Sequence, residues 1–358
     1  MLKPERTRGA VIAGTGRALP ERILSNADLE KLVETSDEWI VSRTGIRERR
    51  MVAPGEENSD LAAAAARNAL EAAGLTPDDV DHIFVATVTP DRMLPSMACT
   101  VQHKLGASHA AALDINAACS GFLYGLQIAQ ALVTTGASDT VLLIGSETLT
   151  RILDFEDRNT CVLFGDGAGA AVIRPCEAGV GVLAVKLGAD GGQGDMLTVP
   201  AGGSEKPATH ETVAAREHFI KMRGNELFKF AVRAMESISR DALAEAGRDA
   251  SELAALIPHQ ANRRIIDATA ERLDIATEKV FMNIDRYGNT SSASVPILLD
   301  EVVRDGRIKT GDLLEFVAFG GGVTWGAAVT TWNPQAAWPI AAREARGSIA
   351  AVKTGAPA

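Results

Sequence analysis

The sequence predicts an α/β protein made of two similar halves, each with a mixed sheet between helices. Short runs of Val, Ile and Leu without strict alternation recur along the 358 residues, as is typical of strands buried on both faces. Landmarks also recur at one interval: Asn116 and Asn289 lie 173 residues apart, and so do Ile83 and Leu256. This interval is too long for a solenoid repeat. We therefore expect two packed α/β units with a cleft where they meet.

The first half should begin with a strand and continue through alternating helices and strands. Thr35 and Glu38 form a capping-box pattern ahead of Trp39, and Ser59 begins an alanine-rich helix that Gly74 ends. The strands expected in this half are 10–14, 83–88, 112–115, 141–145 and 168–173.

The second half repeats this order. Leu142 and Glu315, in corresponding strands, are again 173 residues apart, whereas the closing segments 169–172 and 326–329 match at an interval of 157. One loop is therefore shorter in the second half. The strands expected here are 182–187, 253–257, 280–283, 313–318 and 327–331. We expect a first half at 1–178, a second half at 179–332 and an alanine-rich C-terminal extension at 333–358.

Composition and charge exclude several classes of protein. A net charge of −10 argues against a general nucleic-acid binder, which needs a basic face. The polar start shows no signal peptide, and no apolar run approaches the roughly 18 residues needed to span a membrane, so we expect a cytoplasmic protein without membrane contact. None of the four cysteines forms a CxxC pair, and a disulfide frame is not expected.

Cys119 is the candidate nucleophile. The preceding segment reads as the end of a strand, small residues turn the chain, and an apolar helix follows. This places the thiol near a helix N-terminus, where the helix dipole favours the thiolate. Most of the remaining cysteines, which are Cys99, Cys161 and Cys176, should be small buried hydrophobes.

His259 and Asn289 are the candidate partners of the thiol. His259 follows a buried strand at its C-terminal end, the edge where open α/β sheets place ligands. Asn289 lies between a strand and a helix, in a Gly-Asn-Thr-Ser run that taken alone is ordinary turn material. The repeat changes this reading, because a pseudo-twofold axis would bring Cys119 and Asn289 to one cleft. A Cys with a distant His and Asn is a known nucleophilic arrangement.

The glycine-rich runs predict no nucleotide cofactor. Gly14-Thr15-Gly16 lacks the third glycine of a dinucleotide fingerprint, and neither a P-loop nor zinc-ligand spacing occurs. The run 165–169 suits tight packing of a strand. The run 320–322 follows a strand and could present backbone N–H groups to an oxyanion.

From about residue 9 to residue 332 the sequence resembles the β-ketoacyl-acyl carrier protein synthase III family. The resemblance rests on motifs in family order at 36–41 with 43–46, around Cys119, and at 164–169, 259–262, 288–291 and 318–326. It implies the thiolase fold, with five αβαβα layers, and a homodimer. It also implies a decarboxylative condensation of an acyl-CoA primer with malonyl-acyl carrier protein, initiating fatty acid biosynthesis without a cofactor or metal.

The resemblance also assigns residues. Cys119 would form a thioester, His259 and Asn289 would hydrogen-bond the malonyl thioester as it becomes an enolate, and the N–H groups of Cys119 and Gly321 would form the oxyanion hole. The residues implied for CoA are Thr35, Trp39, Arg43, Arg158, Gly224, Phe228, Ala261 and Asn262. The residues implied for carrier-protein docking are Lys229, Gln260, Ala261, Asn262, Arg263 and Arg264. Those implied for the acyl pocket are Leu94, from the partner subunit, and Phe319.

Two other functions stay open at this point, and a third is discounted. A condensing enzyme or acyltransferase of polyketide or quinolone-type secondary metabolism would share the same catalytic residues. A non-catalytic protein that binds acyl-CoA or a carrier protein would not need the Cys119, His259 and Asn289 set. A thiolase proper would need a second cysteine as base, and segment 318–326 has none. The loop 188–217 matches the family poorly, so it should shape the substrate tunnel in its own way.

Overall fold

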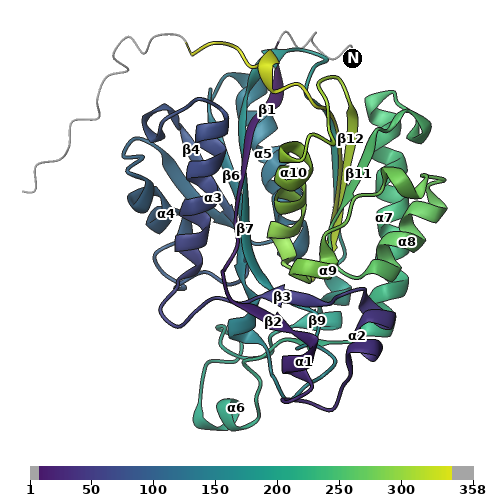
Figure 1. Cartoon of the computed structure of the whole chain (residues 1–358). Coiled ribbons are helices and arrows are strands. Elements are labelled where there is room, and N and C mark those ends of the chain that lie inside the picture. The colour runs from purple at the N-terminus through teal and green to yellow at the C-terminus, as the bar shows by residue number, and fades with distance from the viewer. Residues whose placement is uncertain (1–7, 341–358) are drawn as a thin grey trace, which may run out of the picture.

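The structure, a computed structural model, describes residues 8–340 and has five layers in the order helix, sheet, helix, sheet, helix (Figure 1). This is the layer order that the resemblance implied. The helices of the three helical layers are α3 (Asn58–Ala72) and α4 (Met97–Leu105), then α5 (Gly121–Thr135) and α10 (Ser294–Arg304), then α7 (Gly224–Ala246) and α8 (Arg263–Arg272). Within residues 8–340, no helix is long and apolar enough to cross a membrane.

The two sheets have corresponding strand orders. The first runs β1-β7-β6-β4-β5 and the second β8-β13-β12-β11, and in each the first two pairs are antiparallel and the pairing that follows is parallel. Strands of the first sheet are β1 (Arg8–Ala18), β4 (His82–Ala86), β5 (Ala111–Ile115), β6 (Val141–Thr148) and β7 (Asp166–Glu177). Strands of the second are β8 (Val182–Ala189), β11 (Ala255–Pro258), β12 (Leu313–Gly320) and β13 (Thr324–Thr331).

The predicted repeat is confirmed down to the strand register. In the first sheet Ile83 pairs with Leu142, and in the second Leu256 pairs with Glu315, both in parallel. Each residue of the second pair follows its counterpart by 173 positions. The sequence interval therefore reports a true structural correspondence rather than a chance likeness of short motifs.

The middle layer closes around the largest apolar cluster of the protein. Leu126 of α5 and Leu298 of α10 pack with inner-face residues of both sheets, including Leu143 and Phe316. Each helix is preceded by a 3-10 turn: the first elbow (Ala118–Ser120) leads into α5 and the second elbow (Ser291–Ala293) into α10. Both elbows thus lie between the sheets, where a cleft was expected.

Shorter elements gather below the layers in the view of Figure 1. They are β2 (Ile23–Ser25), α1 (Asn26–Leu29), α2 (Asp37–Thr44), β3 (Glu48–Arg50), β9 (Leu197–Thr198), α6 (His210–Ala214), β10 (Lys221–Met222) and α9 (Ile284–Tyr287). The fully buried Arg49 of β3 links this strand to β2 and α1 and to segment 160–164. Its guanidinium donates to Leu24 O, Asn26 Oδ1 and Val162 O. The loop 188–217 is anchored by a salt bridge of Arg216 to Asp154.

Several predicted details differ from the structure. The cap of α2 is Ser36, whose hydroxyl accepts the N–H of Trp39 at 3.1 Å, whereas the Thr35 hydroxyl has no partner among the described residues. The helix expected from Ser59 begins one residue earlier, at Asn58. The strand expected at 280–283 is reduced to a single bridge between Val280 and Leu256.

The start of the expected extension packs back on the first sheet. Trp338 donates its backbone N–H to Pro175 O at 2.8 Å, and its ring lies 5.4 Å from the Arg8 guanidinium. The basic residues expected in the tail, Arg343, Arg346 and Lys353, lie outside the described residues.

Candidate active site

Cys119 lies at the centre of the first elbow, directly before α5. Its side chain is 6% exposed, and the preceding Ala118 has a φ of 45°, a left-handed conformation that turns the chain sharply from β5 into the helix. The predicted setting of the thiol, between a strand and a helix N-terminus, is confirmed.

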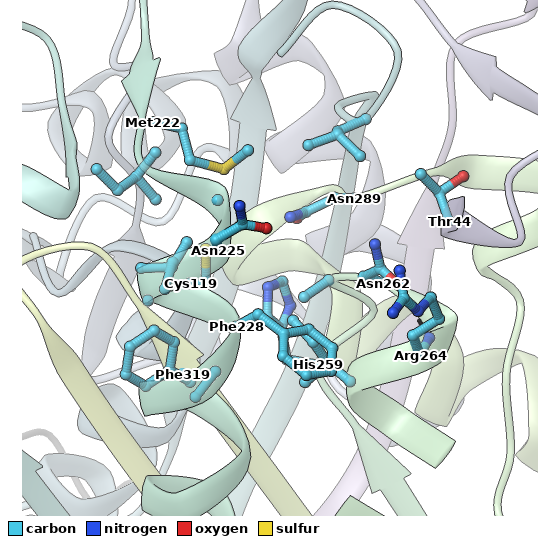
Figure 2. Close-up of a pocket in the computed structure, with 18 of the residues that line it drawn as sticks. Thr44, Cys119, Met222, Asn225, Phe228, His259, Asn262, Arg264, Asn289 and Phe319 are labelled. Atoms are coloured by element: carbon cyan, nitrogen blue, oxygen red, sulfur yellow. Dashed lines mark hydrogen bonds between the residues drawn. The ribbon is translucent and has the colours of Figure 1, made fainter. Parts of the chain in front are cut away.

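Two cavities meet at this thiol. The first, of about 390 Å³, is lined by Cys119, His259 and Asn289, and its lining also includes the charged residues Arg43 and Arg264. Figure 2 shows the three polar side chains entering it from separate segments. Sequence reasoning predicted that the repeat would bring them to one cleft, and it does.

The second cavity, of about 340 Å³, lies on the other side of the sulfur and is largely apolar. Cys119, Phe164 and Leu197 line both cavities, so the thiol stands at their junction. The remaining apolar lining of the second cavity comes from Val88, Leu149, Ile152, Val199 and Ile220.

The electrostatic setting of the thiol differs from the expectation. Burial raises the pKa of Cys119 to about 11, and the nearby Glu147 carboxylate acts in the same direction. The Ser291 hydroxyl and the backbone N–H groups of Cys119 and Gly321 near the sulfur act to lower the pKa, but by less. The resting group is therefore a thiol, because desolvation outweighs the effect expected from the helix N-terminus.

His259 follows β11 and is 1% exposed. Burial lowers its pKa to about 3, so the imidazole is neutral at physiological pH. Its Nδ1 lies 2.6 Å from Ser294 Oγ, which leaves Nε2 for the cavity. A neutral ring in this position can exchange one hydrogen bond with a substrate without adding charge.

Asn289 is fixed on both sides. Its backbone N–H donates to Leu163 O at 2.9 Å and its carbonyl accepts the N–H of Gly165 at 3.0 Å, which pins it to the glycine-rich segment 164–169. Its Oδ1 accepts the Ser291 N–H at 2.8 Å. The amide NH₂ is therefore the end left to donate into the cavity.

Known proteins resemble this chain over most of its length. Residues 113–191 match the family described as 3-Oxoacyl-[acyl-carrier-protein (ACP)] synthase III, and residues 243–332 match its C-terminal region. The chain is 56% identical to the beta-ketoacyl-[acyl-carrier-protein] synthase III of Caldanaerobacter subterraneus over 90% of its own length and 98% of that protein. The chain belongs to the β-ketoacyl-acyl carrier protein synthase III family.

Solved structures agree with this membership. The 3-oxoacyl-[acyl-carrier-protein] synthase III of Aquifex aeolicus matches with a TM-score of 0.83 and 48% identity, over 90% of this chain and 99% of that one. The priming β-ketosynthase of the R1128 polyketide pathway matches with a TM-score of 0.86 and 36% identity, over 92% and 98%. The predicted fold class and enzyme class, a condensing acyltransferase that initiates fatty acid biosynthesis, are confirmed.

The residues that the synthase III resemblance assigned to CoA lie at the first cavity or beside it. Arg43, Gly224, Phe228, Ala261 and Asn262 line it. Trp39 and Arg158 stand behind Arg43, with the Trp39 ring 4.8 Å from the Arg43 guanidinium and 5.5 Å from that of Arg158. Thr35 is outside the lining, in the turn before α2.

Of the residues assigned to carrier-protein docking, Lys229, Ala261, Asn262 and Arg264 line the first cavity, and Arg263 lies beside it with its side chain 61% exposed. Gln260 has to be removed from this set. It is 1% exposed, donates to Pro258 O at 2.7 Å and accepts the N–H of Asn283 at 3.1 Å. Its carboxamide holds the turn after β11 rather than facing a partner.

The two acyl-pocket assignments have different outcomes. Phe319 lines the first cavity, not the apolar second one, and packs on Phe230 with ring centroids 5.7 Å apart. Its assignment to the acyl pocket stays a prediction, and it would fail if the acyl chain occupied the second cavity. Leu94 lies outside both cavities and is 85% exposed, so in a single chain its side chain lines nothing.

Sequence reasoning missed part of the site. Leu197 comes from the loop 188–217 that matched the family poorly, and Met222 lies just after that loop, where β10 pairs with β9. Three further residues support the catalytic residues from the side away from the cavity, and they are Glu147, Ser291 and Ser294. The Ser-rich run 290–294 beside Asn289 was the one sequence signal for them. Within residues 8–340, no cluster of His, Cys, Asp and Glu could hold a metal ion.

Proposed function

We propose that the chain condenses an acyl-CoA primer with malonyl-acyl carrier protein to give a 3-oxoacyl-acyl carrier protein, with Cys119 holding the acyl group between two half-reactions. The supporting observation is the place of the thiol at the junction of two cavities. The apolar cavity can hold the acyl chain after transfer. The other cavity is then free for the second substrate, and it is the one that His259 and Asn289 line.

In the first half-reaction the Cys119 sulfur attacks the thioester carbonyl of the primer. The bond between the carbonyl carbon and the CoA sulfur breaks, and the thiol proton ends on that sulfur. The N–H groups of Cys119 and Gly321, which act to lower the pKa of the Cys119 thiol, stabilise the negative oxygen of the tetrahedral intermediate.

In the second half-reaction the malonyl thioester loses CO₂, and the electron pair passes into the thioester as an enolate. His259 and Asn289 donate hydrogen bonds to its oxygen, and its carbon attacks the acyl-Cys119 carbonyl. The bond between that carbonyl carbon and the sulfur breaks, and the released Cys119 thiolate takes up a proton from solvent. Two neutral donors stabilise an enolate without protonating it early. Because CO₂ departure supplies the electron pair, this route needs no cofactor.

Both substrates are anionic, and positive side chains surround the entrance of the first cavity. We assign Trp39, Arg43 and Arg158 to the CoA nucleotide, because the stacked cations and ring suit an adenine with phosphates. Lys229 and Arg264 are assigned to the carrier protein. On a protein of charge −10 such a local basic rim steers acidic partners.

A homodimer with a shared acyl pocket is also proposed. Strand β5 is the edge of the first sheet with unpaired backbone groups, and Leu113 on it is 44% exposed. Met93 and Leu94 stand exposed nearby in sequence. A second copy would cover these apolar groups and receive Leu94 in its acyl cavity. Four free cysteines among the described residues suit a reducing cytoplasm.

The proposal is tested by separating the half-reactions. His259→Ala and Asn289→Ala should lower CO₂ release from malonyl-carrier protein by about 10²–10³-fold, the cost of one oxyanion donor, while leaving acylation of Cys119 largely intact. Equal losses in both half-reactions would assign these residues a structural role. Failure of the wild type to form any Cys119 adduct would favour a non-catalytic binding protein.

The primer is tested separately. Leu94 has a smaller side chain than an aromatic residue would have at this position, so it would leave more room in the acyl pocket. We therefore propose that the enzyme accepts branched or medium-length primers beyond acetyl-CoA, each extra buried CH₂ being worth about 0.8 kcal/mol. The kcat/KM values for acetyl-, isobutyryl-, hexanoyl- and octanoyl-CoA should shift toward acetyl-CoA in Leu94→Phe. An unmoved profile, or a monomer in sedimentation, contradicts this assignment.

A further inference from the structure

Ser294 is the polar contact of the catalytic imidazole on the side away from the cavity. It is the first residue of α10, directly after the second elbow, and both side chains are 1% exposed. Its Oγ lies 2.6 Å from His259 Nδ1, a short distance for a hydrogen bond. Ser294 thus decides which nitrogen of the ring carries the proton, provided that its own hydroxyl proton can be placed.

The surroundings of Ser294 place that proton. Its Oγ already accepts the backbone N–H of Gln260 at 3.3 Å. Among residues 8–340, His259 Nδ1 is the acceptor within reach of the hydroxyl. A buried O–H group left without an acceptor costs about 1–3 kcal/mol, so the hydroxyl donates to Nδ1. Nδ1 is then unprotonated.

A neutral imidazole with an unprotonated Nδ1 carries its proton on Nε2. We propose that Ser294 is a positioning residue that holds His259 in the Nε2–H tautomer, so that the ring meets the substrate as a hydrogen-bond donor. The opposite tautomer would turn a lone pair toward the enolate oxygen and repel it. Ring neutrality follows from burial, which lowers the pKa of His259 to about 3.

The same logic operates at the other donor. The Ser291 N–H occupies Asn289 Oδ1 at 2.8 Å and leaves the NH₂ group to face the cavity. Residues of one short segment, 291–294, therefore set the polarity of both donors before a substrate binds. Such preorganised donors need no reorientation as charge develops in the transition state.

This inference rests on the proposed role of His259 in enolate stabilisation, and its first test is independent of activity. Ring ¹⁵N chemical shifts of labelled His259 in the intact protein distinguish the two neutral tautomers. The wild type should show a protonated Nε2, and Ser294→Ala should show a mixture or the Nδ1–H form. A protonated Nδ1 in the wild type, or an unchanged tautomer in Ser294→Ala, overturns the proposal, and the wild-type spectrum decides even if the variant fails to fold.

Kinetics provide the second test. Ser294→Ala should slow CO₂ release by about tenfold or more, up to the 10²–10³-fold cost of a lost donor, with Cys119 acylation within about twofold of wild type. Ser294→Thr, which restores a hydroxyl, should recover part of the rate. Ser59→Ala is the matched control, because it removes a fully buried hydroxyl outside the site. If the tautomer responds as expected but CO₂ release does not, the tautomer assignment stands and the donor role of His259 is refuted.

Discussion

The two elbows share a backbone but not a chemistry. Ala118 in the first and Ser291 in the second have φ values of 45° and 50°, and both turns lead directly into a buried helix. The residue at the centre of the turn is Cys119 in one and Ser292 in the other, 173 positions on. The same geometry therefore presents a thiol to the substrates in one half and a hydroxyl to the protein interior in the other.

The residues beneath the elbows explain this difference. The first elbow rests on Gly320, where an added Cβ would lie 2.5 Å from the Cys119 nitrogen. The corresponding position under the second elbow is Glu147, whose carboxylate accepts the hydroxyls of Ser291 and Ser292. The first elbow can face the substrate because only the backbone of Gly320 lies beneath it. The second elbow is hydrogen-bonded to the buried carboxylate of Glu147. The fold therefore provides two similar elbows, and a few side chains determine which of them carries the reactive group.

The largest predicted effect comes from replacing the central residue of each elbow, Cys119 or Ser292, with alanine. Cys119→Ala should abolish acylation by acyl-CoA, because Cys119 is the nucleophile that lines both cavities among residues 8–340. Ser292→Ala should keep acylation and lose about 1 kcal/mol of stability with its hydrogen bond. Intact-protein mass and peptide mapping read out both. An adduct that survives Cys119→Ala would place the nucleophile elsewhere.

Gly320→Ala should have the next largest effect. The new methyl would contact the Cys119 nitrogen at 2.5 Å and its Cβ at 3.0 Å, so the first elbow must shift away from the strand. A displacement of this kind moves both the sulfur and an oxyanion N–H, and a misplacement of about 1 Å can cost about 10²-fold in rate. The acylation rate, measured by quenching the reaction at set times and weighing the intact protein by mass spectrometry, should fall by about that factor.

Gly191→Ala provides the control for that variant, since its added Cβ has no heavy atom within 4 Å. Acylation in this variant should match the wild type. If Gly320→Ala acylates at the wild-type rate while folding normally, close support of the elbow by β12 is not what positions the thiol.

The repeat made much of this predictable from sequence. Strands that are buried on both faces keep their apolar runs and their register. The interval of 173 residues therefore also relates paired residues in the sheets, such as Leu256 and Glu315. Cys119 and His259 were likewise found because each follows a strand at the edge where the halves meet, and Asn289 was found because it lies 173 residues after Asn116. These features depend on local pattern and chain order, which a sequence retains.

What the sequence could not show depends on single side-chain contacts. The strand expected at 280–283 is missing because the Gln260 carboxamide, not a neighbouring strand, takes the N–H of Asn283. That contact also removes Gln260 from the docking surface. The thiol pKa was misjudged for a similar reason: a helix start is visible in a sequence, whereas the full burial that raises the pKa of Cys119 is not.

A third prediction concerns stability. Glu315 is fully buried on β12, where the Ser239 hydroxyl only partly offsets the effect of burial on its carboxyl, and it corresponds to Leu142 in the first sheet. Burial raises its pKa to about 7 from the usual 4.5. Its carboxyl is neutral below pH 4.5 in both states, and the folded state loses stability as pH rises from there to about 7. Above pH 7 the loss is complete, at about 3 kcal/mol for a shift of this size.

Glu315→Leu makes the second sheet like the first and should remove this loss. Denaturant unfolding should find the variant more stable by about 3 kcal/mol at pH 8, with a much smaller difference at pH 5. Glu315→Gln, which stays neutral, separates charge from polarity and should show the same pH trend. A stability difference that does not change with pH would mean that Glu315 is not the titrating group.

The smallest predicted effect tests the charge beneath the second elbow. Glu147 is fully buried, and burial raises the pKa of its carboxyl, whereas hydrogen bonds from the Thr89, Ser291 and Ser292 hydroxyls and from the Val88 N–H act in the opposite direction and favour the charged form. A negative charge there disfavours the Cys119 thiolate and raises the pKa of Cys119, in addition to the larger effect of burial. Glu147→Gln removes the charge but keeps the shape, so that pKa should fall. The alkaline rise of the acylation rate should move to lower pH, with acylation at pH 8 faster by less than about tenfold, since one pKa unit changes the thiolate fraction tenfold. A rise that stays in place while the enzyme remains folded would show that the carboxylate holds the elbow without tuning the thiol, and the two elbows would then differ in support alone.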